Sequence, residues 1–226
     1  MAVGLVGISA LIQELQAAST AWIVGQSHWS RAQQQAVASL QQYLDSGQPG
    51  HLQQARAQLD VPLADLEARR ALERDPPDTA AARAAFLRGN NAKGDLNRLI
   101  LSYRHGRDLA YFREASRLWR ETDAPLLEIA RIGDELERRI AAGPIEGDQA
   151  RAYQQRLQQL DLQLQDTARS FSLALVHMSS LVRLTTLIVG ALSVVAIAIV
   201  AVLLARRVRI DLMEQEARFR AAFYQA

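Results

Sequence analysis

Leu184–Ala205 reads LTTLIVGALSVVAIAIVAVLLA, a run of 22 residues without a charged side chain. An α-helix of this length extends about 33 Å, enough to cross a hydrocarbon core of roughly 30 Å. A buried helix of a water-soluble protein is usually apolar on one side only, whereas Ile188–Leu204 is apolar all round. The run therefore predicts a transmembrane helix at residues 184–205, surrounded by a lipid bilayer.

Arginines flank this helix unequally and predict its orientation. Arg206, Arg207 and Arg209 follow it directly, whereas the 15 residues before it contain only Arg169 and Arg183. Excess arginine marks the cytoplasmic side. We therefore expect the C-terminus in the cytoplasm and the bulk of the chain outside. In a Gram-negative bacterium this places the chain in the inner membrane, with its body in the periplasm.

Composition and charge indicate the fold class and argue against one class of function. The chain has 226 residues, 26 Lys and Arg, 24 Asp and Glu, and no cysteine, which excludes disulfides and thiolate metal sites. Abundant Ala, Leu, Gln, Arg and Glu indicate an all-α protein. Residues 13–183 carry 21 basic and 21 acidic side chains. Nucleic-acid binding needs a clustered basic face, so this balance argues against it.

The N-terminus is apolar but short. Ala2–Ile12 covers about half a membrane helix, and no basic segment precedes it as in a secretory signal. We interpret residues 1–12 as part of a first transmembrane helix, with Met1 an internal or misassigned start. A short hydrophobic docking segment is the alternative.

Helix-breaking residues divide residues 13–183, which we expect to form a helical sensor bundle. The predicted breaks are Gly47–Gly50, Asp75–Asp78, Gly89–Asn91, Thr122–Pro125 and Gly143–Pro144. We expect a long first helix over about Ser9–Asp45 and a helix over Asp95–Glu121. Between them, Asp60 is expected to cap a short helix with Pro62 in its first turn.

A single long helix is expected from about Asp148 through the membrane into the tail, because no proline follows Pro144. Two sets of residues in this helix are spaced seven residues apart, as in the seam of a coiled coil. The first set is Leu157, Leu164, Phe171 and Met178, and the second is Leu160, Thr167, Ala174 and Leu181. Such a seam serves either the core within one chain or a contact between two chains. We expect a mixture, with a homodimer formed through residues 148–183 and the membrane helix.

The tail, residues 206–226, is predicted to be a cytoplasmic signalling helix. Its end, Glu216-Ala-Arg-Phe-Arg-Ala-Ala-Phe-Tyr-Gln-Ala226, resembles the opening helix of a PAS domain. Such domains often start with a charged residue, Arg-Phe-Arg, and then Phe and Ala at helical spacing. The resemblance covers about a twentieth of the chain and implies that a PAS domain begins here. An amphipathic juxtamembrane helix is the alternative.

Residues 20–140 also resemble a known group of sensors. The motifs are Gly25–Gln33, Val61–Asp65 with Arg69–Glu73, Phe86–Asn90, and Trp119 with Asp123. They are similar to helical sensor regions of bacterial membrane proteins that carry cytoplasmic PAS domains. These are followed by GGDEF/EAL cyclic-di-GMP modules or by histidine kinases. The segment after Asn90, Asn-Ala-Lys-Gly-Asp95, departs from the usual pattern.

The chain offers no catalytic motif, and we expect neither an enzyme activity, a cofactor nor a metal in it. His28, His51, His105 and His177 are scattered, and only His105 has an acidic neighbour on the same helix face. If the bundle binds a small extracytoplasmic ligand, the candidate residues are Trp29, Arg69, Glu73, Asn90, Trp119 and Asp123. Their structural alternatives are core packing for the tryptophans, a helix end for Asn90 and a helix cap for Asp123.

These observations predict the sensory and membrane-spanning part of a bacterial signal-transduction receptor. An outside stimulus would move its first and last helices and act on a cytoplasmic output module absent from this sequence. From the resemblance, that module is a diguanylate cyclase/phosphodiesterase or a histidine kinase. The alternative is a ligand-free, membrane-anchored helical scaffold or assembly module.

Overall fold

The computed structural model describes residues 2–145 and 147–223. Some side chains within this range lie outside the description, those of residues 2–12, 110, 111, 178, 181, 182, 211 and 214–223. The described residues are all-α and contain no strand, as the composition predicts.

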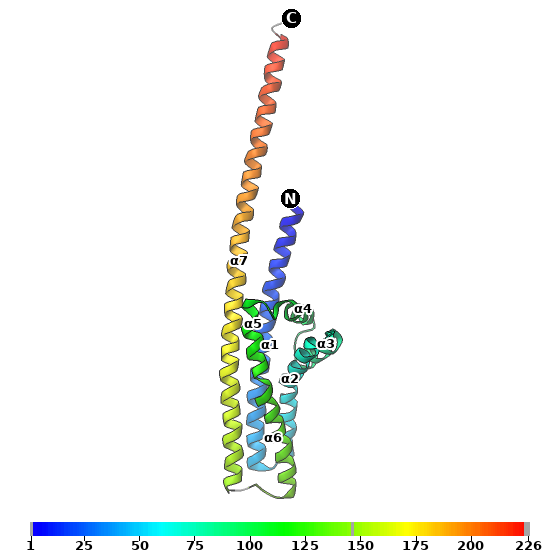
Figure 1. Ribbon diagram of the computed structural model, residues 1–226, viewed down its shortest axis with the longest axis vertical. Helices are drawn as coiled ribbons and strands as arrows, with labels where there is room; N and C mark the ends of the chain where they lie inside the picture. The colour runs from blue at the N-terminus through cyan, green and yellow to red at the C-terminus, as the bar shows by residue number, and fades with distance from the viewer. Residues whose placement is uncertain (1, 146, 224–226) are drawn as a thin grey trace.

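Seven helices make up the described part of the chain (Figure 1). They are α1 (Ala2–Ser46), α2 (Pro49–Glu73), α3 (Thr79–Arg88), α4 (Leu96–Gly106), α5 (Ala110–Glu121), α6 (Asp123–Ala142) and α7 (Gly147–Phe223). In one half of the bundle α1, α2, α6 and α7 lie side by side, and in the other half α5 takes the place of α6 beside α7. The expected plan of long first and last helices with shorter ones between them is confirmed.

The two long helices leave the bundle at the same end (Figure 1). Within α7, Arg183–Ile210 is long and apolar enough to cross a membrane, and its most apolar stretch is not buried in the bundle. Among the described residues it is the one such segment. The backbone of residues 2–12 is helical as the start of α1, but the side chains of these residues, which were expected to form part of a first membrane helix, lie outside the description. So do the side chains of residues 216–226, on which the PAS resemblance rests.

The interior consists of two adjoining cores. An aromatic core nearer the projecting ends contains Trp22, Phe86, Tyr103, Phe112 and Trp119, which pack with Phe171 and Leu175 of α7. An aliphatic core in the four-helix half contains mostly Leu, Ile, Val and Ala, including Leu40, Leu126 and Leu160. The largest buried side chains therefore lie near the end of the bundle from which α1 and α7 project.

The expected helix start at Asp60 is wrong, because α2 continues through Pro62. Proline inside a helix loses one backbone hydrogen bond and costs about 3 kcal/mol or more. Leu59, Pro62 and Leu66 are all buried, three and four residues apart on the same face of the helix. Burial of this apolar face offsets the local cost.

The expected continuous helix over Asp95–Glu121 is also wrong. It breaks between Gly106 and Ala110, where Leu109 adopts an extended backbone conformation. Tyr103 and Phe112 are nine residues apart and would face opposite sides of a straight helix. The break lets both rings enter the aromatic core, where their centroids are 6.2 Å apart.

The buried face of α7 follows the 3.6-residue period of a straight helix. Leu157, Leu160, Leu164 and Phe171 of the expected seam are buried, but Thr167 and Ala174 are only half-buried. Ala168 and Leu175 take the buried positions instead. The other expected positions, Met178 and Leu181, have side chains outside the description. The described part of the seam thus packs against helices of its own chain.

Candidate ligand-binding site

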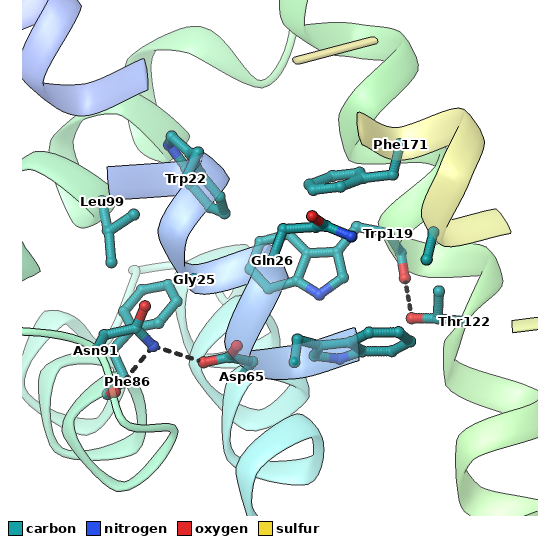
Figure 2. A pocket seen from close by; sticks show the side chains of 12 residues that line it. Trp22, Gly25, Gln26, Asp65, Phe86, Asn91, Leu99, Trp119, Thr122 and Phe171 are labelled. Atoms are coloured by element: carbon teal, nitrogen blue, oxygen red, sulfur yellow. Dashed lines mark hydrogen bonds between the residues drawn. The ribbon is translucent and has the colours of Figure 1, made fainter. Parts of the chain in front are cut away.

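A small cavity lies where the aromatic and aliphatic cores meet (Figure 2). Its volume is about 40 Å³, enough to hold water but far below the roughly 150 Å³ of a cavity that binds benzene. Six helices and two connecting segments contribute to its wall. The lining residues are Trp22, Gly25, Gln26, Trp29, Asp65, Phe86, Asn91, Leu99, Trp119, Thr122, Ala168 and Phe171.

Asp65 brings a carboxyl group into this mainly aromatic wall. The side chain of Asn91 donates a hydrogen bond of 2.9 Å to Oδ1 of Asp65 and another of 3.0 Å to the backbone carbonyl of Phe86. Figure 2 shows both bonds. A Cβ atom on Gly89 would overlap Oδ1 of Asp65, and one on Gly25 would lie 2.8 Å from Oδ1 of Asn91. Both glycines therefore make room for the Asp65–Asn91 pair.

Burial raises the pKa of Asp65 well above that of an ordinary carboxyl group, and the Asn91 hydrogen bond opposes this only partly. The folded chain then binds a proton at Asp65 at pH values where the unfolded chain has lost it. Stability from this group is complete below the unfolded pKa and falls as the pH rises toward the folded pKa. Ionised Asp65 therefore destabilises the fold unless another group compensates its charge.

The cavity also contains an unpaired hydrogen-bond donor. Nε1 of Trp29 is buried and has no partner among the described residues. The indoles of Trp22 and Trp119 meet edge to face with centroids 5.2 Å apart. These three are the only tryptophans in the chain, and all line the cavity. Tryptophan fluorescence consequently reports on this one site.

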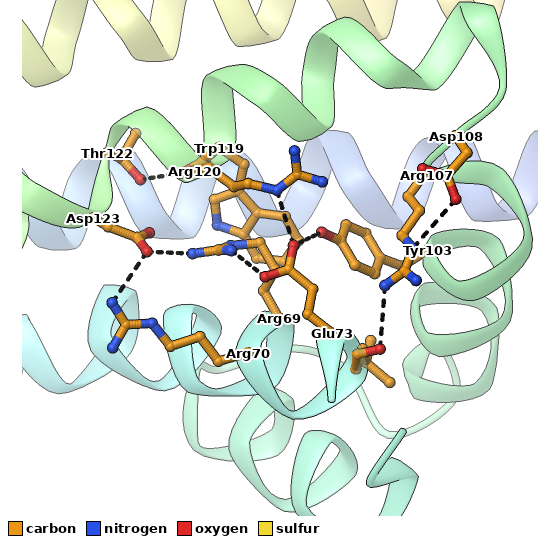
Figure 3. Close-up of polar contacts among 11 residues, drawn as sticks. Arg69, Arg70, Glu73, Tyr103, Arg107, Asp108, Trp119, Arg120, Thr122 and Asp123 are labelled. Atoms are coloured by element: carbon orange, nitrogen blue, oxygen red, sulfur yellow. Dashed lines mark hydrogen bonds and ion pairs between the residues drawn. The ribbon is translucent and has the colours of Figure 1, made fainter. Parts of the chain in front are cut away.

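A network of ion pairs around the buried Arg69 lies on another side of Trp119 (Figure 3). The Arg69 side chain is 3% exposed, and its guanidinium group binds Glu73 at 2.7 Å and also Asp123, the first residue of α6. It lies 5.7 Å from the centroid of the Trp119 ring. Arg70, whose side chain is on the surface, lies 3.3 Å from the same oxygen of Asp123. Asp123 thus connects α6 to α2. The helix-cap role that its residue type indicates is not observed, because no hydrogen bond from its side chain to the backbone at the start of α6 is found among the described residues.

Glu73 extends the network to α4 and α5. Its Oε1 accepts hydrogen bonds from the Tyr103 hydroxyl at 2.6 Å and from Arg120 at 2.9 Å. Burial alone would raise the pKa of Glu73, but these two hydrogen bonds and the nearby positive charges outweigh it, so the pKa is lowered. The pKa of Tyr103 is raised, by burial first and by the Glu73 carboxylate second. At neutral pH the network therefore holds charged Glu73 and a neutral tyrosine.

The structure brings five of the six sequence candidates together. Trp29 and Trp119 line the cavity, and Arg69, Glu73 and Asp123 form the adjoining ion network. Asn90 is exposed and is absent from the cavity wall. It has a positive φ of 62°, which closes α3. Sequence reasoning missed Asp65, Asn91 and Trp22, which supply the cavity wall with a carboxyl group, its amide partner and an indole ring.

No protein-family model, curated protein or solved structure matches this chain. Among the described residues, no group of three His, Cys, Asp or Glu side chains is placed to hold a metal ion. The aromatic cavity, with the carboxyl group of Asp65 in its wall, is the candidate site for a ligand.

Proposed function

We propose that this chain is the sensory and membrane-spanning part of a bacterial signal-transduction receptor. One observation carries the proposal: the helices that project from the bundle, α1 and α7, are also two walls of the cavity. Trp22 and Trp29 come from α1, and Ala168 and Phe171 come from α7. Anything that changes the cavity acts directly on the two helices that lead toward the membrane (Figure 1).

The continuity of α7 gives a physical route across the membrane. Leu184 follows Phe171 by 13 residues, about 20 Å along an unbroken helix. Helices in packed bundles shift against one another by about 1–2 Å between discrete arrangements. A ligand acts on such an equilibrium only as far as it prefers one arrangement. A cavity between α1 and α7 supplies that preference, because its shape depends on their relative position.

In this proposal the bundle lies in the periplasm, α7 crosses the inner membrane, and the output module lies in the cytoplasm. The chain itself is not catalytic. The resemblance of residues 216–226 to the start of a PAS domain suggests that a PAS domain receives the motion. A cyclic-di-GMP enzyme or a histidine kinase would then be the output.

The first test concerns orientation. The chain has no cysteine, so Ser46→Cys and Arg209→Cys each introduce a single reactive thiol. Both positions are exposed, Ser46 at the far end of the bundle and Arg209 after the uncharged run 184–205. In intact cells with a permeabilised outer membrane, we expect an impermeant maleimide to label position 46 fully and position 209 only after lysis. Labelling in the reverse order would contradict the orientation.

The second test changes the cavity without a ligand. In Gly25→Ala, the new Cβ would lie 2.8 Å from Asn91 Oδ1. The Asn91 amide is held by hydrogen bonds to Asp65 and to the Phe86 carbonyl, so relief of the overlap either breaks these bonds or moves α1 away from the end of α3. Spin labels at Leu15→Cys and Leu187→Cys report the separation of α1 and α7 toward the membrane; both positions are exposed. In lipid nanodiscs we expect Gly25→Ala to shift this distance by about 1–2 Å.

Gly50→Ala is the matched control, since a Cβ there meets nothing within 4 Å. It should leave the distance unchanged. If Gly25→Ala gives the same distance distribution as Gly50→Ala, the cavity does not control the helices. The ligand-free scaffold would then be the better description of the chain.

A further inference from the structure

A groove lies between α1 and α4 at the end of the bundle from which the two long helices project. Its volume is about 390 Å³, and its wall is mainly apolar. Leu15, Leu101 and Leu109 line it, and all three side chains are exposed. Figure 1 shows α4 and the start of α5 at this end of the bundle. The described residues therefore leave an apolar surface uncovered beside the projecting helices.

The position of this groove along the helices is close to the expected membrane surface. Trp22 of α1 and Phe171 of α7 line the same cavity and so mark one level along the two helices. From this level Leu15 lies seven residues nearer the membrane, about 10 Å, and Leu184 lies thirteen residues nearer, about 20 Å. The groove at Leu15 is thus about 10 Å from the start of the hydrocarbon core. Head groups occupy about 5–7 Å on each side of that core, so the groove lies close to the headgroup layer.

The surface around the groove is positively charged, unlike the bundle as a whole. Residues 96–113 contain four arginines and one acidic residue, whereas residues 13–183 carry equal numbers of basic and acidic side chains. Two of the four arginines form ion pairs within the chain. Arg104 and Arg113 are exposed, and neither forms an ion pair among the described residues. Each of them directly follows or precedes a residue of the groove wall in the sequence. Two guanidinium groups without an anionic partner therefore lie beside the apolar groove.

We propose that the α4–α5 corner, residues 96–113, binds the anionic headgroup layer of the bilayer that α7 crosses. Lipid phosphates pair with Arg104 and Arg113, and the interfacial layer covers the exposed leucines of the groove. Arginine binds phosphate through two parallel hydrogen bonds, and its long side chain spans the remaining few ångströms between the groove and the head groups. Apolar contact and attraction to anionic lipids act together at such a surface. This inference rests on the part of the proposed function in which α7 crosses a membrane.

Other occupants fit this corner less well. In a symmetric contact with a second copy, the same arginines would meet one another, and like charges placed together at an interface are costly. A soluble acidic protein would have to enter between the bundle and the bilayer. The bilayer is already held at this end by α7, so its contact with the corner is intramolecular and can be weak.

A nitroxide label at Leu101→Cys tests the proposal on the full chain in nanodiscs. The chain has no cysteine, so the label is unique, and position 101 is exposed. Collision with a neutral, water-soluble nickel chelate measures how far the label is shielded from water. Each arginine near an anionic surface favours the bound state about fivefold, so two should change the ratio of bound to free corner at least about tenfold. We expect this shielding when phosphatidylglycerol replaces half of the phosphatidylcholine.

A label at Leu127→Cys, exposed on α6, is the control for position and should be equally accessible in both lipid compositions. Equal accessibility of the label at 101 in both compositions overturns the proposal. Shielding that occurs only in nanodiscs with two copies of the chain assigns the groove to a second copy, and this also overturns it.

Arg104→Glu tests the contact with lipid phosphate. We expect it to lower the effect of phosphatidylglycerol on the label at 101 at least about fivefold. Arg31→Glu is the matched control, since Arg31 is also exposed, forms no ion pair among the described residues and lies nine residues beyond Trp22, away from the membrane. Both variants should keep the unfolding temperature of the parent chain. If Arg104→Glu and Arg31→Glu respond alike to phosphatidylglycerol, the proposal is wrong.

The lipid contact and the proposed function can fail separately. If the label at 101 is shielded by phosphatidylglycerol but Gly25→Ala leaves the distance between labels at 15 and 187 unchanged, the lipid contact stands and transmission from the cavity fails. If Gly25→Ala shifts that distance and phosphatidylglycerol has no effect at 101, transmission stands and the lipid contact fails.

Discussion

Arg69→Met is expected to lower the free energy of unfolding by about 1.5–3 kcal/mol. The buried Arg69 makes hydrogen bonds to the charged Glu73 and Asp123, and hydrogen bonds to charged groups contribute about this much. Without Arg69, the exposed Arg70 is the one arginine left on Asp123, so the buried contact between α2 and the start of α6 is lost. In a chain of this size each kcal/mol corresponds to about 2–4 °C. Thermal unfolding followed by circular dichroism in nanodiscs measures the change.

Arg70→Met is the matched control. Arg70 reaches the same Asp123 oxygen, but its side chain is 52% exposed, and such pairs contribute about 0–1 kcal/mol. We expect a loss within that range. If Arg69→Met is no more destabilising than Arg70→Met, the buried network does not hold the α2–α6 junction, and Asp123 has the structural role of an ordinary helix start.

The fold could be predicted where local chemistry determines it. Gly47 has a positive φ of 66° and ends α1, and Gly143–Pro144 ends α6, as their residue types indicate. The two errors came from positions where tertiary packing overrides local preference. Pro62 carries a helix-start signal, but its neighbours are buried on one face. The break between Gly106 and Ala110 follows from the need to bury two aromatic rings together.

The repeat on α7 shows the same limit. A seven-residue pattern and a straight-helix pattern agree at Leu157, Leu160, Leu164 and Phe171, so the sequence indicated most of the buried face. They diverge between those positions, where Ala168 is buried and Thr167 is not fully so. Which pattern holds depends on whether the partner helices come from the same chain, and no periodicity in a single helix contains that information.

The residues of the candidate site could likewise be predicted from the sequence only in part. Tryptophans and charged residues at helix breaks pointed to Trp29, Trp119 and the Arg69 network. Asp65 was missed because a carboxylate inside a helix normally faces solvent. One signal was available: Asp65 lies three residues after Pro62 and four before Arg69, on the buried face of α2. Asn91 depends on how the chain leaves α3, which residue type alone does not determine.

Val176→Pro is expected to uncouple the cavity from the membrane helix. Proline removes the bond from the backbone N–H of residue 176 and clashes with the preceding turn, at a cost of about 3 kcal/mol or more for an intact helix. Position 176 is 54% exposed and directly follows Leu175, which is buried in the aromatic core. The bundle should therefore stay folded while α7 bends between the cavity and Leu184.

Two label pairs separate the bend from its consequence. Labels at Leu162→Cys and Leu187→Cys, both exposed, are 25 residues apart, so an unbroken α7 gives a narrow distance near about 38 Å. Val176→Pro should broaden and shorten it, and Val176→Ala should not. In the pair at 15 and 187, the shift caused by Gly25→Ala should persist with Val176→Ala and disappear with Val176→Pro. If the shift survives a demonstrably bent α7, the signal does not travel through this helix as a rigid rod, and α1 must carry it instead.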